Sequence, residues 1–379
     1  MPVYFDHNAT TPLDPRVLEA MMPYLTGPYA NASSLHRLGR AARDAVERAR
    51  DQLAQAVGCQ PGEIVWTSGG TESNNLAIKG STAGQRPTRV LYGATEHPAV
   101  MEAAESLRSS GWMVEPVAVD GCGIVDWAAF ERQLAQAPLR LVSLMRVNNE
   151  TGVLQDVARA AALARAQRAL FHVDAVQALG KIPLDFAATG ADLMSLSSHK
   201  LYGPKGIGAL VRRREVDLSA QLHGGPQERG LRGGTENVAA IVGFGVAAEL
   251  AKAKLESRTQ ALAALHAHLT AGLHALPGVR IFGEGAARMP NTVQFCVPGY
   301  EGEALLMQLD RKGFAVSSGS ACASGKGQPS HVLLAMGVAR DIAFGAIRVS
   351  LGVQNTTDEI DRFLATLATL TAGAAGATA

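Results

Sequence analysis

The amino-acid sequence predicts an α/β protein, in which a mainly parallel β-sheet is covered by helices on both faces and is joined to a smaller α+β unit. Over roughly the first 250 residues, short β-rich runs alternate with helical stretches of about ten residues or more, a pattern typical of parallel sheets. From about residue 235 the pattern changes to a long Ala- and Leu-rich helical stretch, followed by shorter elements. A chain of 379 residues is long enough for about two domains.

Each element of the first unit follows from local spacing. Apolar residues at helical spacing predict the helices, and the first of them ends at Gly58, a residue type that commonly ends helices. Short β-branched and apolar runs predict the strands. The expected helices are 34–57, 71–79, 98–109, 127–137 and 156–168. The expected strands are 63–67, 89–92, 113–119, 139–147, 169–173, 193–196 and 207–211.

The second unit begins with the stretch 236–276, which has no strand pattern and predicts one or two helices that bridge to the rest. Short strands and two helices are expected after it. The strands are 278–282, 292–296, 315–317 and 346–351, and the helices are 301–312 and a terminal helix from residue 357.

Composition excludes several functional classes. The formal net charge is +1, from 35 basic and 34 acidic residues, which argues against a dedicated nucleic-acid or anionic-membrane surface. There is no leader-like segment and no apolar run of about 18 residues, so a cytoplasmic location is expected. The four cysteines lack metal-site and disulfide-scaffold spacing, and no H-E-x-x-H motif occurs, so no metal site is expected.

Three polar clusters follow expected strands, where ligands bind in sheets of this kind. The segment 68–72, Ser-Gly-Gly-Thr-Glu, opens a helix and suits a phosphate, although the same residues also read as an ordinary helix cap. Asp174, with Gln177 three residues later, either pairs with a cation or caps a turn. Lys200 either forms a Schiff base with an aldehyde cofactor or is a solvated surface lysine.

A fourth segment, 317–325, consists of small residues around Cys322. Such a loop is expected to be mobile and its thiol accessible, unless the cysteine is incidental to a small-residue turn. Cys59, Cys122 and Cys296 have no such context and no assigned role. Three motifs each follow a strand: the phosphate-binding segment, an Asp-x-x-Gln and a His-Lys. Together they predict a site for pyridoxal 5′-phosphate (PLP) at the end of an α/β sheet.

The ordered series of motifs resembles the cysteine desulfurases of the NifS/IscS type, members of the class-V aminotransferases and of the fold-type I PLP enzymes. The resemblance runs from 6–12 to 347–352, through the motifs at 67–73, 95–97, 147–152, 172–177, 198–200, 229–237 and 317–322. It implies an aspartate aminotransferase-like fold with a seven-stranded sheet. The large PLP-binding domain would span 15–255, and the small domain would combine 1–14 with 256–379 and carry the cysteine loop.

The resemblance also implies residue roles. Lys200 would bind PLP covalently and then shuttle protons, Asp174 would pair with the pyridine nitrogen, and Gln177 would contact the ring hydroxyl. His97 would stack on the ring and serve as an acid or base. Further roles fall to residues that would hold the phosphate, bind the substrate carboxylate, or orient cofactor and substrate. The phosphate would be held by Gly70, Thr71, Ser197, His199 and, from a second subunit, Thr235. Arg348 would bind the carboxylate of the substrate, and Asn149 would orient cofactor and substrate.

The implied reaction converts L-cysteine to L-alanine and leaves a persulfide on Cys322, for iron–sulfur cluster or other sulfur-compound biosynthesis. The implied partners are a second copy of the chain in a homodimer and a sulfur-acceptor protein such as an iron–sulfur scaffold. The loop 323–330 matches the class with an extended cysteine loop, whereas the short tail after the last helix leaves the acceptor open. Selenocysteine lyase, transamination and a non-catalytic scaffold remain as alternatives.

Overall fold

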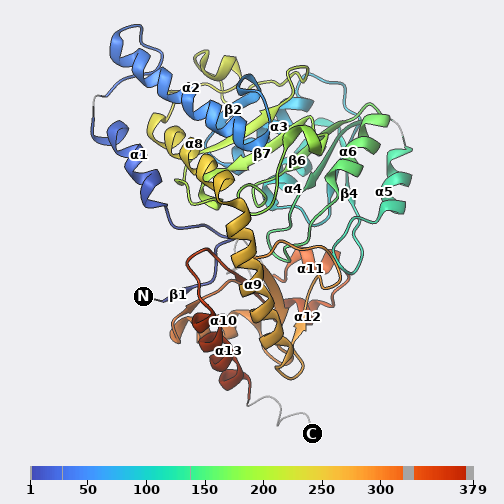
Figure 1. Ribbon diagram of the computed structural model, residues 1–379. Helices are drawn as coiled ribbons and strands as arrows, with labels where there is room; N and C mark the ends of the chain where they lie inside the picture. The colour runs from blue at the N-terminus through green and yellow to red at the C-terminus, as the bar shows by residue number, and fades with distance from the viewer. Residues whose placement is uncertain (1, 28, 137, 319–327, 373–379) are drawn as a thin grey trace.

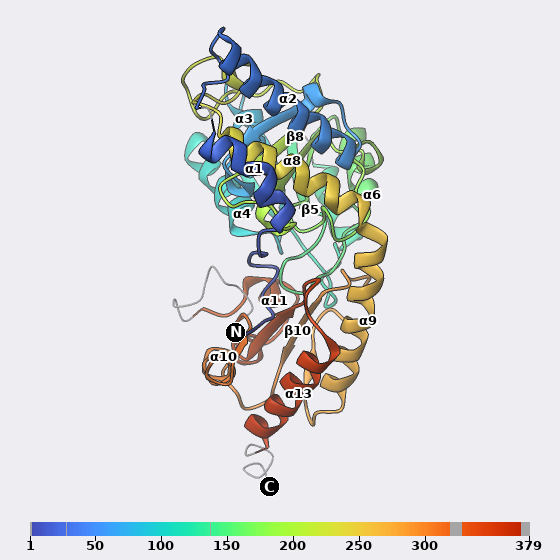
Figure 2. The ribbon, with the colours of Figure 1, turned by 60° about the vertical axis from the view of Figure 1, so that its left-hand side comes forward.

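The computed structural model describes residues 2–27, 29–136, 138–318 and 328–372. A larger α/β part contains the central sheet, and a smaller part lies beyond its edge (Figure 1). The long helix α9 (Leu255–His274) runs from the larger part along the smaller one, as Figure 2 shows from a second direction. In the described part of the chain, no helix is both long and apolar enough to cross a membrane.

The central sheet has seven strands, in the order β2-β8-β7-β6-β5-β3-β4. Only β8 runs antiparallel to its neighbours, so the mainly parallel seven-stranded sheet expected from the sequence is confirmed. The strands are β2 (Ile64–Thr67), β3 (Arg89–Gly93), β4 (Met113–Val117), β5 (Leu139–Met145), β6 (Leu170–Asp174), β7 (Leu193–Ser197) and β8 (Gly208–Arg212).

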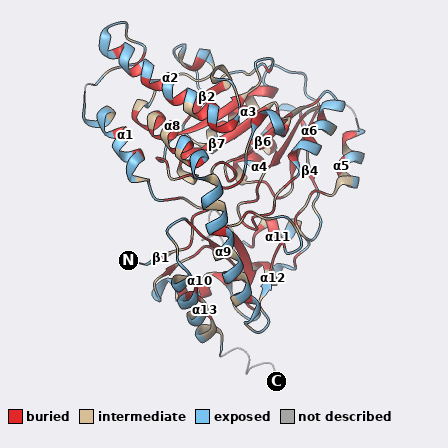
Figure 3. Ribbon diagram, viewed as in Figure 1, coloured by how far each residue is buried: buried red, intermediate tan, exposed pale blue. Residues whose placement is uncertain are grey.

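Helices cover both faces of this sheet, because successive strand residues point to opposite faces. In β2, Ile64 and Trp66 join the core under α2, α5, α6 and α8, whereas Val65 joins the core under α3. Burial is therefore concentrated in the sheet and on the inner sides of the helices (Figure 3). The helices are α1 (Pro15–Thr26), α2 (Arg37–Val57), α3 (Gly70–Thr82), α4 (Pro98–Glu105), α5 (Trp127–Leu134), α6 (Val157–Ala166), α7 (Phe186–Thr189) and α8 (Val238–Ala253).

The smaller part is built on an antiparallel sheet, β12-β10-β9, and a two-stranded parallel pair, β1-β11. Its apolar core is separate from that of the large sheet and includes Phe5, Leu269, Phe295 and Phe363. The elements are β1 (Val3–Tyr4), β9 (Arg280–Ile281), β10 (Thr292–Cys296), α10 (Gly302–Arg311), β11 (Phe314–Ala315), α11 (His331–Ala335), α12 (Arg340–Phe344), β12 (Ala346–Ser350) and α13 (Thr357–Thr371).

Some elements differ from the sequence-based expectation. The expected helix 98–109 is α4 followed by a 3₁₀ turn (Ser106–Ser110). The stretch 236–276, expected as one or two helices, forms two that meet at Lys254. Helix α1 was not expected; Asp14 caps its N-terminus by accepting a hydrogen bond from the backbone N–H of Arg16, and Pro15 starts it.

Candidate active site

A cavity of about 290 Å³ opens where the carboxyl ends of the central strands face the smaller part. Met145, Asp174 and Ser197, the last residues of β5, β6 and β7, line it. Arg348, on β12, lines it from the other part of the molecule. Because neighbouring parallel strands end at the same edge of a sheet, the strand-end clusters singled out in the sequence meet here.

Asp174 provides a buried carboxylate at this edge. Its Oδ2 accepts a hydrogen bond from Asn74 Nδ2 at 2.8 Å, and its Oδ1 accepts one from the backbone N–H of Val176 at 3.0 Å. The buried Glu96 is close enough to interact with it: burial first, and then the charge of Asp174, raises the pKa of Glu96 well above its ordinary value. The raised pKa favours the neutral form of Glu96, which then adds no second negative charge beside Asp174.

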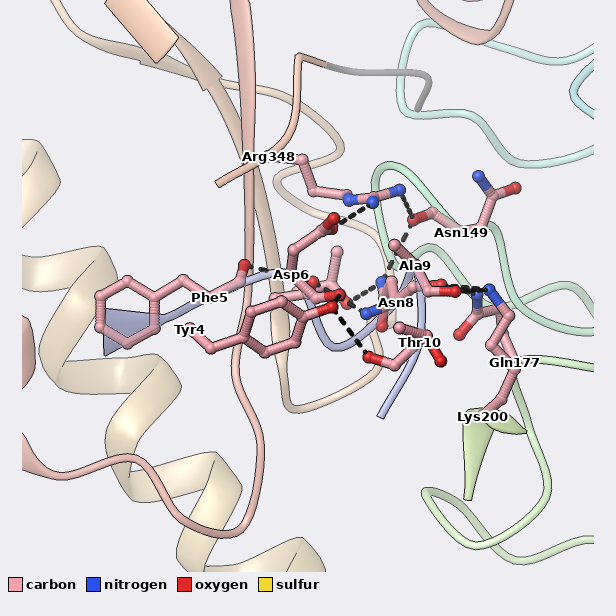
Figure 4. A network of polar contacts seen from close by, with 12 residues as sticks. Tyr4, Phe5, Asp6, Asn8, Ala9, Thr10, Asn149, Gln177, Lys200 and Arg348 are labelled. Carbon is pink, nitrogen blue, oxygen red and sulfur yellow. Dashed lines mark hydrogen bonds and ion pairs between the residues drawn. The ribbon is translucent and has the colours of Figure 1, made fainter. Parts of the chain in front are cut away.

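Lys200 projects into the cavity from the 3₁₀ turn that follows β7. Its Nζ donates to the backbone oxygens of Asn8 and Ala9, the latter at 2.8 Å. Figure 4 shows this N-terminal segment between Lys200 and Arg348. The segment that begins the chain therefore positions an amine that lies about half-way along it.

His97 caps helix α4 at the cavity wall, where its Nδ1 accepts a hydrogen bond from the backbone N–H of Ala99 at 3.1 Å. In the neutral ring the proton is therefore on Nε2. Burial is the main cause that lowers the pKa of His97. The neutral ring can therefore donate its Nε2 proton during a reaction and take a proton back at that nitrogen.

The residues expected to bind a phosphate also meet at this cavity. Gly70 begins α3, and a Cβ added there would lie 2.8 Å from Val176 Cγ2, so a side chain would fill the space. Ser197 Oγ is buried and has no hydrogen-bond partner among the described residues. His199 also lines the cavity; burial, and then the charge of Lys200, lowers the pKa of His199 to about 4. Backbone N–H groups at a helix start, with Thr71 and Ser197, suit a phosphate.

Arg348 is buried at the opposite wall. Its Nη2 lies 2.6 Å from Asp6 Oδ1, and its Nη1 donates to the backbone oxygen of Asn149 at 2.9 Å. Its Nε has no partner among the described residues. The guanidinium is thus held in place on one side while retaining donor capacity for a further anion.

Sequence reasoning missed a set of residues that connect the ones it found. Gln177 Nε2 donates to the backbone oxygen of Asn8 at 2.9 Å, and Lys181 Nζ donates to Gln177 Oε1 at 2.6 Å and to Asn8 Oδ1 at 3.1 Å. Asn74 was missed as well, as the partner of Asp174. Helical spacing could have indicated two of them, because Asn74 follows Thr71 by three residues and Lys181 follows Gln177 by four.

One expected site residue that the structure describes is not brought to the cavity. Thr235 is exposed in the segment before α8 and is not among the lining residues. Cys322 lies outside the described residues. The remaining cysteines stay without a role: burial raises the pKa of Cys59 to about 12 and also raises that of Cys296, while Cys122 donates to the backbone oxygen of Glu284.

Comparison with known proteins gives one consistent result. Residues 3–363 match the family model for class-V aminotransferases. The curated proteins named cysteine desulfurase IscS from Salmonella arizonae and Klebsiella pneumoniae are each 45% identical over 368 residues, which cover 95% of this chain and 90% of theirs.

Solved structures agree with the sequence comparison. A NifS-like protein superposes with a TM-score of 0.92 at 38% identity, over 98% of this chain and 100% of its own. The NifS-like protein of Rickettsia africae gives a TM-score of 0.90 at 35% identity, over 98% and 99%. A structure of SspA in complex with cysteine gives 0.82 at 33%, over 92% and 98%. The chain belongs to the class-V aminotransferase family, in the group that contains these cysteine desulfurases.

Proposed function

We propose that this protein is a PLP-dependent L-cysteine desulfurase, which converts L-cysteine to L-alanine and transfers the sulfur to Cys322. The observation that carries the proposal is that one cavity is lined by Lys200, Asp174, His97 and Arg348. An amine, a buried carboxylate, a neutral imidazole and a guanidinium are the groups that PLP chemistry on an amino acid requires. The relatives named cysteine desulfurase support the choice of substrate.

The residues present fit PLP. Gly70, Thr71, Ser197 and His199 would hold its phosphate, and Lys200 would bind it covalently. Asp174 would pair with the ring nitrogen, Gln177 with the ring hydroxyl, and Asn149 would orient the ring and the substrate. When bound, the cofactor supplies an electron sink for the bonds of the amino acid. The unpartnered Ser197 Oγ and the space left by Gly70 support the phosphate assignment.

Proton movement falls to two groups of this chain. His97 is held at the wall by its bond to Ala99, and its lowered pKa keeps Nδ1 and Nε2 in defined acceptor and donor states near neutral pH. Lys200 Nζ donates to two backbone oxygens, which orient it in the cavity. Arg348 would bind the substrate carboxylate, with Asp6 and Asn149 fixing its plane.

The sulfur step is assigned to Cys322 by its match to the family motif. Its thiolate attacks the sulfur of the substrate; the S–S bond forms, the Cβ–S bond of cysteine breaks, and Cβ takes a proton to give alanine. Thiol plus cysteine thus becomes persulfide plus alanine, with no external oxidant. The sulfur is then passed to an acceptor protein, for iron–sulfur cluster or other sulfur-compound biosynthesis.

We also propose that the protein is a homodimer, located in the cytoplasm. Thr235 matches the family residue that reaches the phosphate of the other subunit, and its exposure in this chain makes it accessible to a second copy. Sedimentation equilibrium of the loaded protein would give the mass of two chains; a monomer with full cofactor binding would contradict the assignment of Thr235.

The decisive experiment measures alanine formed from L-cysteine by the PLP-loaded protein, with a thiol reductant present. We expect the Cys322→Ala variant to lose turnover by at least 100-fold while keeping the visible absorbance of bound cofactor, since the thiol acts after binding. Cys122→Ala is the matched control and should behave as wild type. Wild-type turnover in the Cys322→Ala variant would show that another group accepts the sulfur.

A second variant separates cofactor binding from sulfur transfer. Lys200→Ala should lose the visible absorbance that covalently held PLP gives, and should lose turnover with it. Retention of that absorbance would mean that another amine holds the cofactor. Turnover of selenocysteine by Cys322→Ala, with none of cysteine, would identify an additional lyase activity that needs no enzyme thiol.

A further inference from the structure

Lys181 carries a buried amine that the proposed chemistry does not use. It lies in the turn after β6, with its Nζ 2.6 Å from Gln177 Oε1 and 3.1 Å from Asn8 Oδ1. Among the described residues it forms no ion pair with an Asp or a Glu. Burying a lysine amine without a carboxylate partner lowers the stability of the folded protein. The presence of Lys181 at this position therefore calls for a local structural reason.

The two acceptors of Lys181 are both side-chain amide oxygens, and this fixes the direction of both amides. Because Gln177 Oε1 accepts from Lys181, its Nε2 is left to donate: one N–H goes to the backbone oxygen of Asn8, and Gln177 lines the cavity. Because Asn8 Oδ1 accepts from Lys181, its Nδ2 donates to the backbone oxygen of Asn149 at 3.1 Å and to Thr292 Oγ1 at 2.8 Å.

We propose that Lys181 is a positioning residue, which fixes the amide of Gln177 so that it presents an N–H donor, and not its oxygen, to an anionic oxygen of the bound cofactor. This inference rests on the proposed function. Two contacts hold the amide in this orientation: the backbone oxygen of Asn8 accepts from Nε2, and Lys181 donates to Oε1. Without Lys181, among the described contacts only the Asn8 oxygen opposes a turned amide, which would put the carbonyl oxygen of Gln177 against the oxygen of the ring. Two acceptors facing each other repel, and the cofactor oxygen would lose its donor.

The electrostatics of Lys181 are consistent with a role as a donor. Burial first, and then the charges of Lys200 and Arg348, lowers its pKa well below the ordinary value. A neutral amine has two N–H groups, which match the two amide oxygens that accept from it. The positioning effect therefore does not need the positive charge, and a neutral side chain without N–H groups is the sharpest test.

The test compares Lys181→Met with wild type. Methionine keeps the length and apolar body of lysine and removes only the donors. With PLP bound, we expect the visible absorbance to change with pH at a midpoint about one unit higher than in wild type, because an anionic oxygen without a donor binds its proton more tightly. The affinity of the apoprotein for PLP, measured by fluorescence titration, should fall about tenfold.

A double-mutant cycle separates positioning from simple stabilisation. If Lys181 acts through Gln177, then Gln177→Met gives the same shift, and the double variant adds nothing further. Lys181→Leu lacks the same donors, so one folded variant of the two is sufficient. A midpoint within 0.2 units of wild type, or shifts that add in the double variant, would overturn the proposal. Failure of the proposed function is distinct, since wild type itself would then show no visible band with PLP.

Discussion

His172 is a buried histidine on β6, in the middle of the central sheet, directly before Val173 and two residues before Asp174. Its two ring nitrogens are hydrogen-bonded to Ser143 Oγ at 2.8 Å and to Ser195 Oγ at 2.9 Å, on the neighbouring strands. Burial lowers its pKa from 6.5 to about 3. The folded protein therefore holds a neutral ring over a pH range in which the unfolded chain binds a proton.

This difference predicts how stability depends on pH. Between pH 6.5 and 3 the unfolded state holds more protons at this position than the folded state, so the free energy of unfolding falls as the pH falls. From pH 6.5 to 5 the loss from His172 alone is about 2 kcal/mol. We expect His172→Leu to be less stable than wild type at pH 7, since two serine hydroxyls lose their partner, but to have a flatter pH dependence. Urea unfolding at pH 7 and at pH 5 measures the free energy of unfolding of both proteins. An equal loss between the two pH values in wild type and His172→Leu would show that His172 does not titrate.

At the same scale, local sequence pattern indicates some of the residues that meet at the cavity and not others. Lys200, Asp174 and Gln177 stand in short motifs that follow strands, so local pattern and family resemblance both indicate them, and the cavity brings them together. Asn8 has a role that exists only as contacts between distant segments. No local pattern carries that information.

At the scale of elements, prediction succeeded where a segment has its own apolar pattern. The strand expected at 292–296 is β10 with the same bounds, because all five of its residues are buried. The strands β1 and β11 have two residues each and form only by pairing with one another across the length of the chain, so β1 had no local signal. A helix ended earlier than expected where a 3₁₀ turn replaced its last residues, as after α4.

The packing of α8 on α2 depends on glycine at position 245. A Cβ there would lie 2.7 Å from Ala49 Cα and 2.8 Å from Ala49 Cβ, atoms that cannot move without moving α2. We expect Gly245→Ala to lower the free energy of unfolding by about 1–3 kcal/mol, although alanine favours helices by about 1 kcal/mol.

The comparison variant is Gly243→Ala on the same helix. Its added methyl group meets Met21 Sδ at 2.7 Å and Pro204 Cγ at 2.9 Å, which are side-chain atoms. Thermal or urea unfolding of the two variants should therefore show the smaller loss for Gly243→Ala. Equal stability of Gly245→Ala and wild type would mean that α2 and α8 can separate slightly at no cost.

At the scale of the whole molecule, the first fourteen residues connect the two parts. β1 pairs with β11 in the smaller part, Asn8 contacts Gln177 and Lys200 at the cavity, and Asp14 caps α1 on the larger part. One apolar core gathers residues from Val17 to Ala251 with Met289, and another gathers Val3 and Phe5 with residues from Leu262 to Leu367. These separate cores support our proposal of a large domain, 15–255, and a small one, 1–14 with 256–379.

Because the N-terminal segment both joins the parts and holds Lys200, a substitution that displaces this segment should weaken the site without replacing any residue that lines the cavity. Gly352 offers the means, because a Cβ there would overlap Cε1 of His7, a residue that is 2% exposed. We expect Gly352→Ala to push His7 and the segment outward, and the apoprotein to bind PLP at least tenfold more weakly by fluorescence titration, with a lower thermal midpoint. Gly121→Ala, whose Cβ meets only Met336 O at 3.9 Å, is the control for a glycine exchange in a loop. Wild-type affinity in a destabilised Gly352→Ala would show that the segment holds the two parts together but does not position Lys200.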